Sequence, residues 1–264
     1  MQLKNKTAVI YGASGAIGSA VAHAFAQEGA KVYLTGKSLN NIVALTKEIV
    51  SKGGNAEAHQ VDALDEKAVN SHLEMVINLE GKLDISFNAM GIPQTGVQGI
   101  PLLQLTPEGF THPIMNYTKS HFITATAAAR NMVAKKSGVI LTLTAVPSVL
   151  AAPLVGGMAP SWAGIEALTR TLAAEVGSQG IRVVCLRADG MPETDTITEV
   201  FGLHAQGVGM PSNKEFQGLM ESFTILKRLP KLSEVANTAV FIASDNAGAI
   251  TGTTINITCG SVID

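Results

Sequence analysis

Residues 7–18 read TAVIYGASGAIG and decide the fold. The run TAVIY predicts a short buried strand, and helical periodicity begins at Ala16. Between them, Gly12, Gly15 and Gly18 allow a tight turn and a close approach of the backbone to a pyrophosphate. The N-terminus of the following helix would offer free N–H groups to that anion. The stretch therefore predicts a dinucleotide-binding turn; a helix cap with small packing residues is the alternative.

The alternation of strand and helix continues along the chain. Further strands are predicted at 31–35, 56–61, 83–88, 138–144, 181–187 and 252–258, and helices at 16–28, 39–52, 66–79, 108–135 and 161–178. Strands that alternate with helices form a parallel sheet covered on both faces. Because crossovers are right-handed, the sequence predicts an α/β fold with one Rossmann-like domain over residues 1–264. Its core would be a doubly wound parallel sheet of about seven strands, flanked by helices.

Composition excludes several classes of function. The formal net charge is −2, with both signs spread along the chain, so we expect no nucleic-acid partner. No apolar run reaches the length of about 20 residues that spans a bilayer, and no signal peptide is visible, so no membrane association is expected. Cys185 and Cys259 fall in no metal-binding pattern, and no metal is expected. A reducing, cytoplasmic setting fits this cysteine usage.

Residues 195–223 interrupt the alternation with glycine, methionine and polar residues. A connection of this length between two elements is commonly a flap over a binding site. We expect a substrate-binding lid here; a disordered insertion is the alternative.

The end of the second predicted strand indicates which dinucleotide binds. An acidic residue there binds the ribose hydroxyl of NAD(H), whereas a basic residue accommodates the extra phosphate of NADP(H). The stretch is Thr35-Gly36-Lys37-Ser38 and contains no carboxylate. Lys37 can pair with a phosphate, and Ser38 can hydrogen-bond it. The sequence predicts NADP(H) rather than NAD(H), although Lys37 alone is equally compatible with a solvated surface lysine.

The chain resembles the short-chain dehydrogenase/reductase family over essentially its whole length. Residues 12–18 match the TGxxxGxG loop with Tyr11 in place of threonine, 61–62 match the acid that contacts adenine, and 88–91 match the NAG element. Residues 251–260 match the C-terminal signature imperfectly. Together with the stretches above, the resemblance gives the expected cofactor-binding residues: Gly12, Ser14, Gly15, Ala16, Ile17, Gly18, Gly36, Lys37, Ser38, Asp62, Ala63, Asn88, Ala89, Met90, Ala188, Met191 and Thr194.

The family's catalytic groups are an Asn, a Ser and a Tyr-x-x-x-Lys, in which the Lys lowers the pKa of the Tyr hydroxyl. Matching residues 166–175 to the family's helix puts Met158 at the Tyr and Trp162 at the Lys. The preceding strand puts Ala145 at the Ser. The ungapped register puts Tyr117 at the Asn, and a slip of one residue would put Asn116 there instead. The resemblance therefore implies a nucleotide site without the family's proton-handling groups.

Tyr117 is the candidate replacement, because its hydroxyl could donate to a substrate oxygen or position a water; a core-filling role is the alternative. Trp162 could hydrogen-bond a ribose or a substrate, or simply pack beneath the cofactor. Met158 would make the pocket apolar and adaptable, which favours a bulky hydrophobic substrate. His121, one helical turn from Tyr117, and Asp189, after the sixth strand, are weaker candidates.

Three functions fit these observations. The first is an NADP(H)-dependent oxidoreductase with a non-standard active site that reduces a bulky hydrophobic carbonyl, imine or activated alkene. The last two substrates depend less on an acid directed at oxygen, since the hydride chemistry belongs to the cofactor. The alternatives are an inactive NADP(H)-binding sensor or structural protein, and a non-redox enzyme in the same pocket. The resemblance also implies a homodimer or homotetramer.

Overall fold

Seven parallel strands form the sheet of the computed structural model, which describes residues 1–263. The strands are β1 (Thr7–Tyr11), β2 (Lys31–Gly36), β3 (Asn55–Gln60), β4 (Ile85–Asn88), β5 (Gly138–Ala145), β6 (Ile181–Ala188) and β7 (Thr253–Ile257). Their order across the sheet is β3-β2-β1-β4-β5-β6-β7, so the winding direction reverses between β1 and β4. The predicted doubly wound parallel sheet is confirmed.

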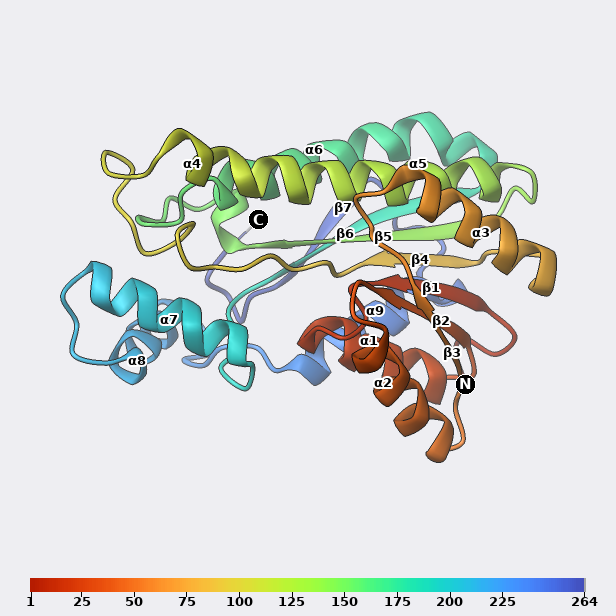
Figure 1. Cartoon of the computed structure of the whole chain (residues 1–264), viewed down its shortest axis with the longest axis horizontal. Helices are drawn as coiled ribbons and strands as arrows, with labels where there is room; N and C mark the ends of the chain where they lie inside the picture. Colours follow the sequence, from red (N-terminus) through yellow and green to blue (C-terminus); the bar gives the residue numbers. More distant parts are fainter. Residues whose placement is uncertain (264) are drawn as a thin grey trace.

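Helices cover both faces of the sheet (Figure 1). One layer holds α1 (Ala16–Gln27), α2 (Leu39–Ser51) and α9 (Leu232–Ala243), and the other holds α3 (Glu66–Glu80), α5 (Lys119–Val133) and α6 (Met158–Val176). The remaining elements are α4 (Pro107–Pro113), a π-helical turn (Ile114–Thr118), α7 (Asp195–Gly207), α8 (Asn213–Phe223) and three short 3₁₀ turns (Val146–Ser148, Gly177–Gln179, Asp245–Ala247).

Two hydrophobic cores lie between these layers and the sheet. Successive side chains of a strand point to opposite faces, so β1 contributes to both cores. Ala8 and Ile10 pack with α1 and α9, whereas Val9 and Tyr11 pack toward α3 and α5. All four side chains are fully buried. A strand buried on both faces explains why TAVIY reads as a continuous apolar run rather than an alternating one.

The helix predicted at 108–135 is not continuous. It divides into α4, the π-helical turn and α5. Pro113 lies inside α4 and has no N–H to donate, and the turn that follows it is widened by one residue. Helical periodicity alone does not reveal such a widened turn, because the apolar spacing resumes normally on either side.

Residues 195–223 are ordered as two helices rather than as an insertion without structure. Thr194 accepts a hydrogen bond from the Ile197 N–H and begins α7, and Ser212 does the same for the Glu215 N–H at the start of α8. We call residues 195–223 the flap. Phe201, Ala205 and Phe216 of the flap form a small core together with Leu229, which follows the flap in the chain. The helix α9 was not predicted at all.

Within residues 1–263, none of the helices combines the length and the apolar character that crossing a bilayer requires.

The buried His72 makes the fold sensitive to acid. Its ring packs against His59 and Tyr33, with centroids 5.0 and 6.2 Å away, and neither ring nitrogen has a hydrogen-bonding partner. Burial, and secondarily the nearby His59, lowers the pKa of His72 from its ordinary 6.5 to about 4. Between these values the unfolded chain binds a proton that the folded chain excludes, so stability is present above pH 6.5 and lost as the pH falls toward 4.

We expect His72→Phe to remove this contribution, which is about 3 kcal/mol between the two pKa values. Urea denaturation of wild type and variant across this pH range measures it, and the variant's stability should fall less with acid. His112→Gln, a change at an exposed histidine, is the control and should keep the wild-type slope. A His72→Phe slope equal to that of the wild type would contradict the interpretation.

Candidate nucleotide and substrate site

The carboxyl ends of the central strands meet around one cavity of about 670 Å³. The ladders pair Tyr11 with Asn88 and Ala145 with Ala188, so the loops that leave β1, β4, β5 and β6 start at the same edge of the sheet. In open α/β sheets ligands bind at this edge, where the winding direction reverses. The flap contributes a further wall of the cavity.

The glycine turn after β1 forms a cradle whose backbone is packed too closely for side chains at Gly12 and Gly18. Gly12 has φ +69°, and a Cβ there would lie 2.7 Å from the Ala89 carbonyl oxygen. A Cβ at Gly18 would lie 2.4 Å from the Gly12 carbonyl oxygen. Gly15 caps α1 without a side-chain bond, and no acidic residue occupies the first turn. Gly15, Ala16 and Ile17 line the cavity at the N-terminus of α1, which fits the pyrophosphate of a dinucleotide.

The Asn88 side chain fixes the loop opposite this cradle. It is buried, and its Nδ2 donates to the Thr124 Oγ1 at 3.0 Å. Its Oδ1 accepts from the Met90 N–H at 2.9 Å, which sets the direction of the chain after β4. Asn88 thus positions Ala89 and Met90 as the floor of the cavity.

The residues expected at the adenine end lie outside the cavity. Lys37 and Asp62 form an ion pair at 3.1 Å, with 67% and 39% of their side-chain surfaces exposed. The Lys37 ammonium is therefore already near an acidic group, but it remains accessible to a phosphate. Asp62 also accepts a hydrogen bond from the Leu64 N–H, so its carboxylate is anchored while the lysine is free to rotate.

The structure divides the expected cofactor residues into two groups. Those that line the cavity are Gly15, Ala16, Ile17, Asn88, Ala89, Met90, Ala188, Met191 and Thr194. Those that lie beneath it or beyond it are Gly12, Ser14, Gly18, Gly36, Lys37, Ser38, Asp62 and Ala63. Thr194 has a structural part as well, because it caps α7 and donates to the Met191 carbonyl.

The four positions matched to the family's catalytic groups converge on the cavity. Ala145 ends β5, and Met158 and Trp162 lie one turn apart at the start of α6. Tyr117 reaches the same place from the π-helical turn, with its ring centroid 6.5 Å from that of Trp162. All four line the cavity, whereas Asn116 turns away and donates to the His112 carbonyl.

The Tyr117 hydroxyl is a weaker acid than a free tyrosine. Burial raises its pKa, and the Ile92 backbone and the Gln94 side chain offset this only in part. The hydroxyl is therefore protonated at neutral pH and can donate a hydrogen bond. This is the reverse of the family arrangement, in which a lysine lowers the tyrosine pKa.

His121 lies beneath Tyr117 as a neutral ring. Its Nδ1 donates to the Tyr117 carbonyl at 2.9 Å, and its buried Nε2 has no partner within residues 1–263. Burial lowers the pKa of His121 to about 4, against the raising effect of the Tyr117 and Asn88 backbones. The ring is therefore uncharged at neutral pH and supplies no cation to the site.

Asp189 is the one acidic side chain in the cavity wall of the described chain. Burial raises its pKa, although the Ser261 hydroxyl and the Gly190 N–H oppose the rise. Both carboxylate oxygens are engaged, one by Gly190 at 2.7 Å and the other by Ser261 at 2.6 Å. Asp189 therefore ties the loop after β6 to the C-terminal segment.

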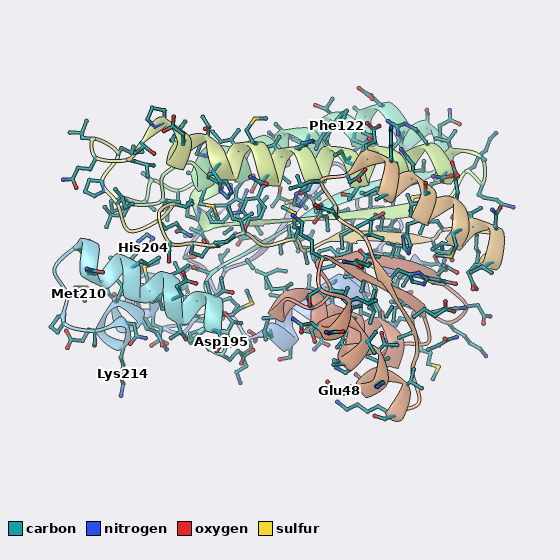
Figure 2. All side chains as sticks on the ribbon, in the orientation of Figure 1. Glu48, Phe122, Asp195, His204, Met210 and Lys214 are labelled. Atoms are coloured by element: carbon teal, nitrogen blue, oxygen red, sulfur yellow. The ribbon has the colours of Figure 1, made fainter. Side chains whose placement is uncertain are left out.

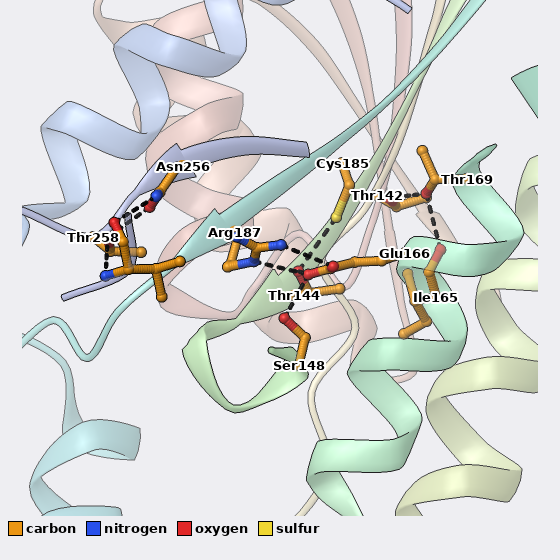
Figure 3. Close-up of polar contacts among 11 residues, drawn as sticks. Thr142, Thr144, Ser148, Ile165, Glu166, Thr169, Cys185, Arg187, Asn256 and Thr258 are labelled. Atoms are coloured by element: carbon orange, nitrogen blue, oxygen red, sulfur yellow. Dashed lines mark hydrogen bonds and ion pairs between the residues drawn. The ribbon is translucent and has the colours of Figure 1, made fainter. Parts of the chain in front are cut away.

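A buried ion pair supports the wall behind the catalytic positions (Figure 3). The Arg187 guanidinium donates to both Glu166 oxygens at 2.9 Å, and each side chain is 4% exposed. Ser148 and Thr144 also donate to Glu166, at 2.5 and 3.0 Å. Burial would raise the Glu166 pKa, but these donors outweigh it and hold the pKa below its ordinary value. The network joins α6, β5, β6 and the 3₁₀ turn after β5.

Three further polar residues of the cavity wall were not predicted from the sequence. Gln94 and Gln98, from the loop after β4, and His204, from α7, are all buried and line the cavity. Gln98 and His204 are 106 residues apart in the chain, and no local pattern connects them.

An open parallel sheet with a glycine cradle at its switch point is the architecture of dinucleotide-binding Rossmann proteins. The sequence model of the family described as Enoyl-(Acyl carrier protein) reductase matches residues 12–261. The chain belongs to the short-chain dehydrogenase/reductase family and is an oxidoreductase of that class.

The chain is similar to the 3-oxoacyl-(acyl-carrier-protein) reductase FabG of Escherichia coli (strain K12), with 30% identity over 260 residues, 98% of each chain. It is also 30% identical over 253 residues to the uncharacterized oxidoreductase YxbG of Bacillus subtilis (strain 168), which covers 95% of this chain and 89% of YxbG. Among solved structures, the NAD⁺-bound xylitol dehydrogenase has a similar fold, with a TM-score of 0.92 at 23% identity over 98% of this chain and 100% of that one.

We expect Arg187→Met to destabilise the protein by about 3–5 kcal/mol, because Glu166 would remain buried without its cation. The double variant Glu166→Gln, Arg187→Met removes the buried charge and should recover most of the loss. Urea denaturation at neutral pH measures both.

The control is Arg228→Met, which breaks the more exposed pair between Arg228 and Glu234 and should change stability far less. Equal losses in the single and double variants would show that the cost does not come from an uncompensated charge.

Proposed function

We propose that this protein is an NADP(H)-dependent oxidoreductase that reduces a bulky, hydrophobic carbonyl, imine or activated alkene, with a preference for the last two. The observation that carries the proposal is the absence of a cation from the cavity at the glycine cradle: Tyr117 lines it but, within residues 1–263, no lysine or arginine does. The dinucleotide would supply the hydride when bound.

Different segments of the protein would contact different parts of the bound cofactor. The N–H groups at the start of α1 would bind the pyrophosphate, and residues 88–90 and 188–191 would enclose the nicotinamide end. Lys37 and Ser38 would meet the extra phosphate of NADP(H) at the end of β2. The similarity to an NAD⁺-bound dehydrogenase and to a reductase supports a nicotinamide cofactor.

The absence of a cation within the described cavity limits what Tyr117 can do. Burial raises its pKa and no nearby positive charge offsets the rise, so transfer of its proton to a substrate oxygen is unfavourable. It can still donate a hydrogen bond and polarise a substrate acceptor. Imines and alkenes that are already polarised need no stronger acid at oxygen, which is why we favour them over simple ketones.

The cavity wall supports a hydrophobic substrate. Met158 and Trp162 form one side, and apolar side chains of the flap such as Phe201, Phe216 and Met220 form the other. We propose that the flap is the substrate lid. Pockets of this size that are lined chiefly by apolar groups suit neutral molecules that bury most of their surface.

Two further expectations remain part of this proposal. A homodimer or homotetramer is supported by the exposed apolar side chains of Met115 in the π-helical turn, 62% exposed, and Phe122 in α5, 51% exposed. Figure 2 shows Phe122 on the outer side of α5. A reducing, cytoplasmic setting is supported by Cys185 and Cys259, which are both free thiols.

Lys37→Ala tests the choice of cofactor. We expect NADPH affinity to fall about 10- to 100-fold, because a charge-assisted contact to the phosphate is lost, while NADH affinity stays unchanged. Fluorescence titration with each nucleotide measures both. Lys47→Ala, at an exposed lysine of α2, is the control and should alter neither. Wild-type affinity for NADH equal to that for NADPH would contradict the assignment.

Tyr117→Phe tests the chemistry. Wild type and variant are mixed with NADPH and a panel of ketones, imines and enones, and nicotinamide absorbance is followed. We expect kcat to fall about 100-fold with little change in KM, because the hydroxyl acts on the reacting group.

Asn116→Ala is the matched control, since Asn116 is the neighbouring residue and the alternative register position; it should retain full activity. Activity lost in Asn116→Ala but kept in Tyr117→Phe would mean that the register is wrong by one. Tight NADPH binding without oxidation on any compound would instead favour a sensor, and product without nicotinamide oxidation would favour non-redox chemistry.

A further inference from the structure

Three polar side chains form a chain of hydrogen bonds across the apolar wall of the cavity. Gln94 donates to the Ile92 carbonyl, Gln98 donates to the Gln94 Oε1 at 2.6 Å, and the His204 Nε2 lies 3.1 Å from the Gln98 Oε1. Their exposed fractions are 3%, 5% and 8%. His204 lies on the side of α7 that faces the rest of the molecule, so this chain links the flap to the loop after β4 (Figure 2).

The Ile92 carbonyl determines which group donates and which accepts in each hydrogen bond of this series. A carbonyl can only accept, so the amino end of the Gln94 amide must face it and the Gln94 Oε1 must face Gln98. Gln98 therefore donates with its own amino group and presents its oxygen to His204. The His204 Nε2 must then carry the hydrogen. In a neutral imidazole the other nitrogen, Nδ1, is consequently a bare acceptor.

The neutral form of His204 follows from its surroundings. Burial lowers the pKa of His204 below its ordinary value, and the ring packs against Phe216 with centroids 5.4 Å apart. No group within residues 1–263 forms a hydrogen bond with the Nδ1. Because His204 lines the cavity, a ligand there can donate the hydrogen bond that the described chain does not supply to this nitrogen.

Close backbone packing holds this acceptor in place. A Cβ at Gly99 would lie 2.8 Å from the Leu203 carbonyl oxygen, and one at Gly207 would lie 2.6 Å from the Gly99 carbonyl oxygen. The loop that carries Gln98 therefore lies directly against the two turns of α7 that flank His204. The flap cannot shift along this loop without breaking the contact, so the position of the acceptor is defined by the backbone.

We propose that the His204 Nδ1 is a substrate-recognition site that accepts a hydrogen bond from a hydroxyl or amide N–H on a neutral, otherwise apolar substrate. This inference rests on the proposed function, because it places a second polar group on the same substrate, away from the group that Tyr117 contacts. Two other candidate acceptors of the cavity are less available: Asp189 is engaged at both oxygens, and the His121 Nε2 is fully buried.

The test compares two ketones that differ only in one hydroxyl, raspberry ketone and benzylacetone. Trp162 is the only tryptophan of the chain and lines the cavity, so its fluorescence reports occupancy. We expect wild type to bind raspberry ketone about tenfold more tightly, the worth of one buried hydrogen bond. His204→Phe keeps the aromatic packing but removes the acceptor, so the preference should fall to parity while benzylacetone affinity is kept.

Gln98→Leu tests whether the order of donors and acceptors in the hydrogen-bond series selects the tautomer of His204. It leaves His204 in place but removes the oxygen that selects its tautomer, so we expect an intermediate preference. His112→Phe makes the same substitution at an exposed histidine and should keep the full preference. Equal binding of the two ketones to wild type, no saturable change with either, or a preference that survives in His204→Phe would each overturn the inference.

NADPH titration of each variant separates this inference from the proposed function. His204→Phe and Gln98→Leu should bind NADPH as wild type does, which also shows that they fold. A wild type that prefers raspberry ketone but binds no nicotinamide nucleotide would refute the proposed function and leave the recognition site standing. A wild type that binds NADPH normally but does not prefer raspberry ketone would refute the recognition site and leave the proposed function standing.

Discussion

The buried ion pair between Glu166 and Arg187 is the contact on which the cavity wall depends. It lies directly behind cavity-lining residues that include two positions matched to the family's catalytic groups. Arg187 precedes Ala188 and Thr144 precedes Ala145. Glu166 follows Trp162 by one helical turn. Two charges buried together are costly unless every oxygen and N–H is satisfied. Here Glu166 accepts from three different side chains, so the pair holds two strands and a helix in one arrangement.

The same pair determines the electrostatic character of the site. The cation behind the cavity wall, Arg187, is neutralised by its own carboxylate partner, and Trp162, the residue matched to the family's lysine, carries no charge. Both buried histidines of the wall, His121 and His204, have lowered pKa values. The described wall holds no lysine or arginine that would stabilise a tyrosinate, so we expect the site to act by hydrogen bonding and shape rather than by a strong acid. Burial, which raises the pKa of Tyr117, acts in the same direction.

Sequence reasoning was strongest where a local pattern has one physical solution. The apolar runs and the glycine turn require a parallel sheet with a cradle at its switch point, and this fold is what the chain adopts. It failed where the outcome depends on distant partners. The widened turn at Tyr117 leaves the apolar spacing of the helix intact. The flap helices, in a polar, glycine-containing stretch, bury a small core that depends on Leu229 from beyond the flap. The roles of the candidate catalytic residues stay predictions, although the fold brings them together.

The polar chain from Ile92 to His204 shows why such a site escapes detection in the sequence. None of its residues belongs to a recognisable sequence motif. The availability of the His204 Nδ1 as an acceptor follows from the order of donors and acceptors that the fold imposes. A backbone carbonyl at one end dictates the tautomer of a ring at the other, through two amides whose own orientation is otherwise free. Reversal of this order would leave the Gln94 oxygen facing the Ile92 carbonyl oxygen, two acceptors without a hydrogen between them. That repulsion is what makes the bare Nδ1 a stable property of the cavity and not one of two equal states.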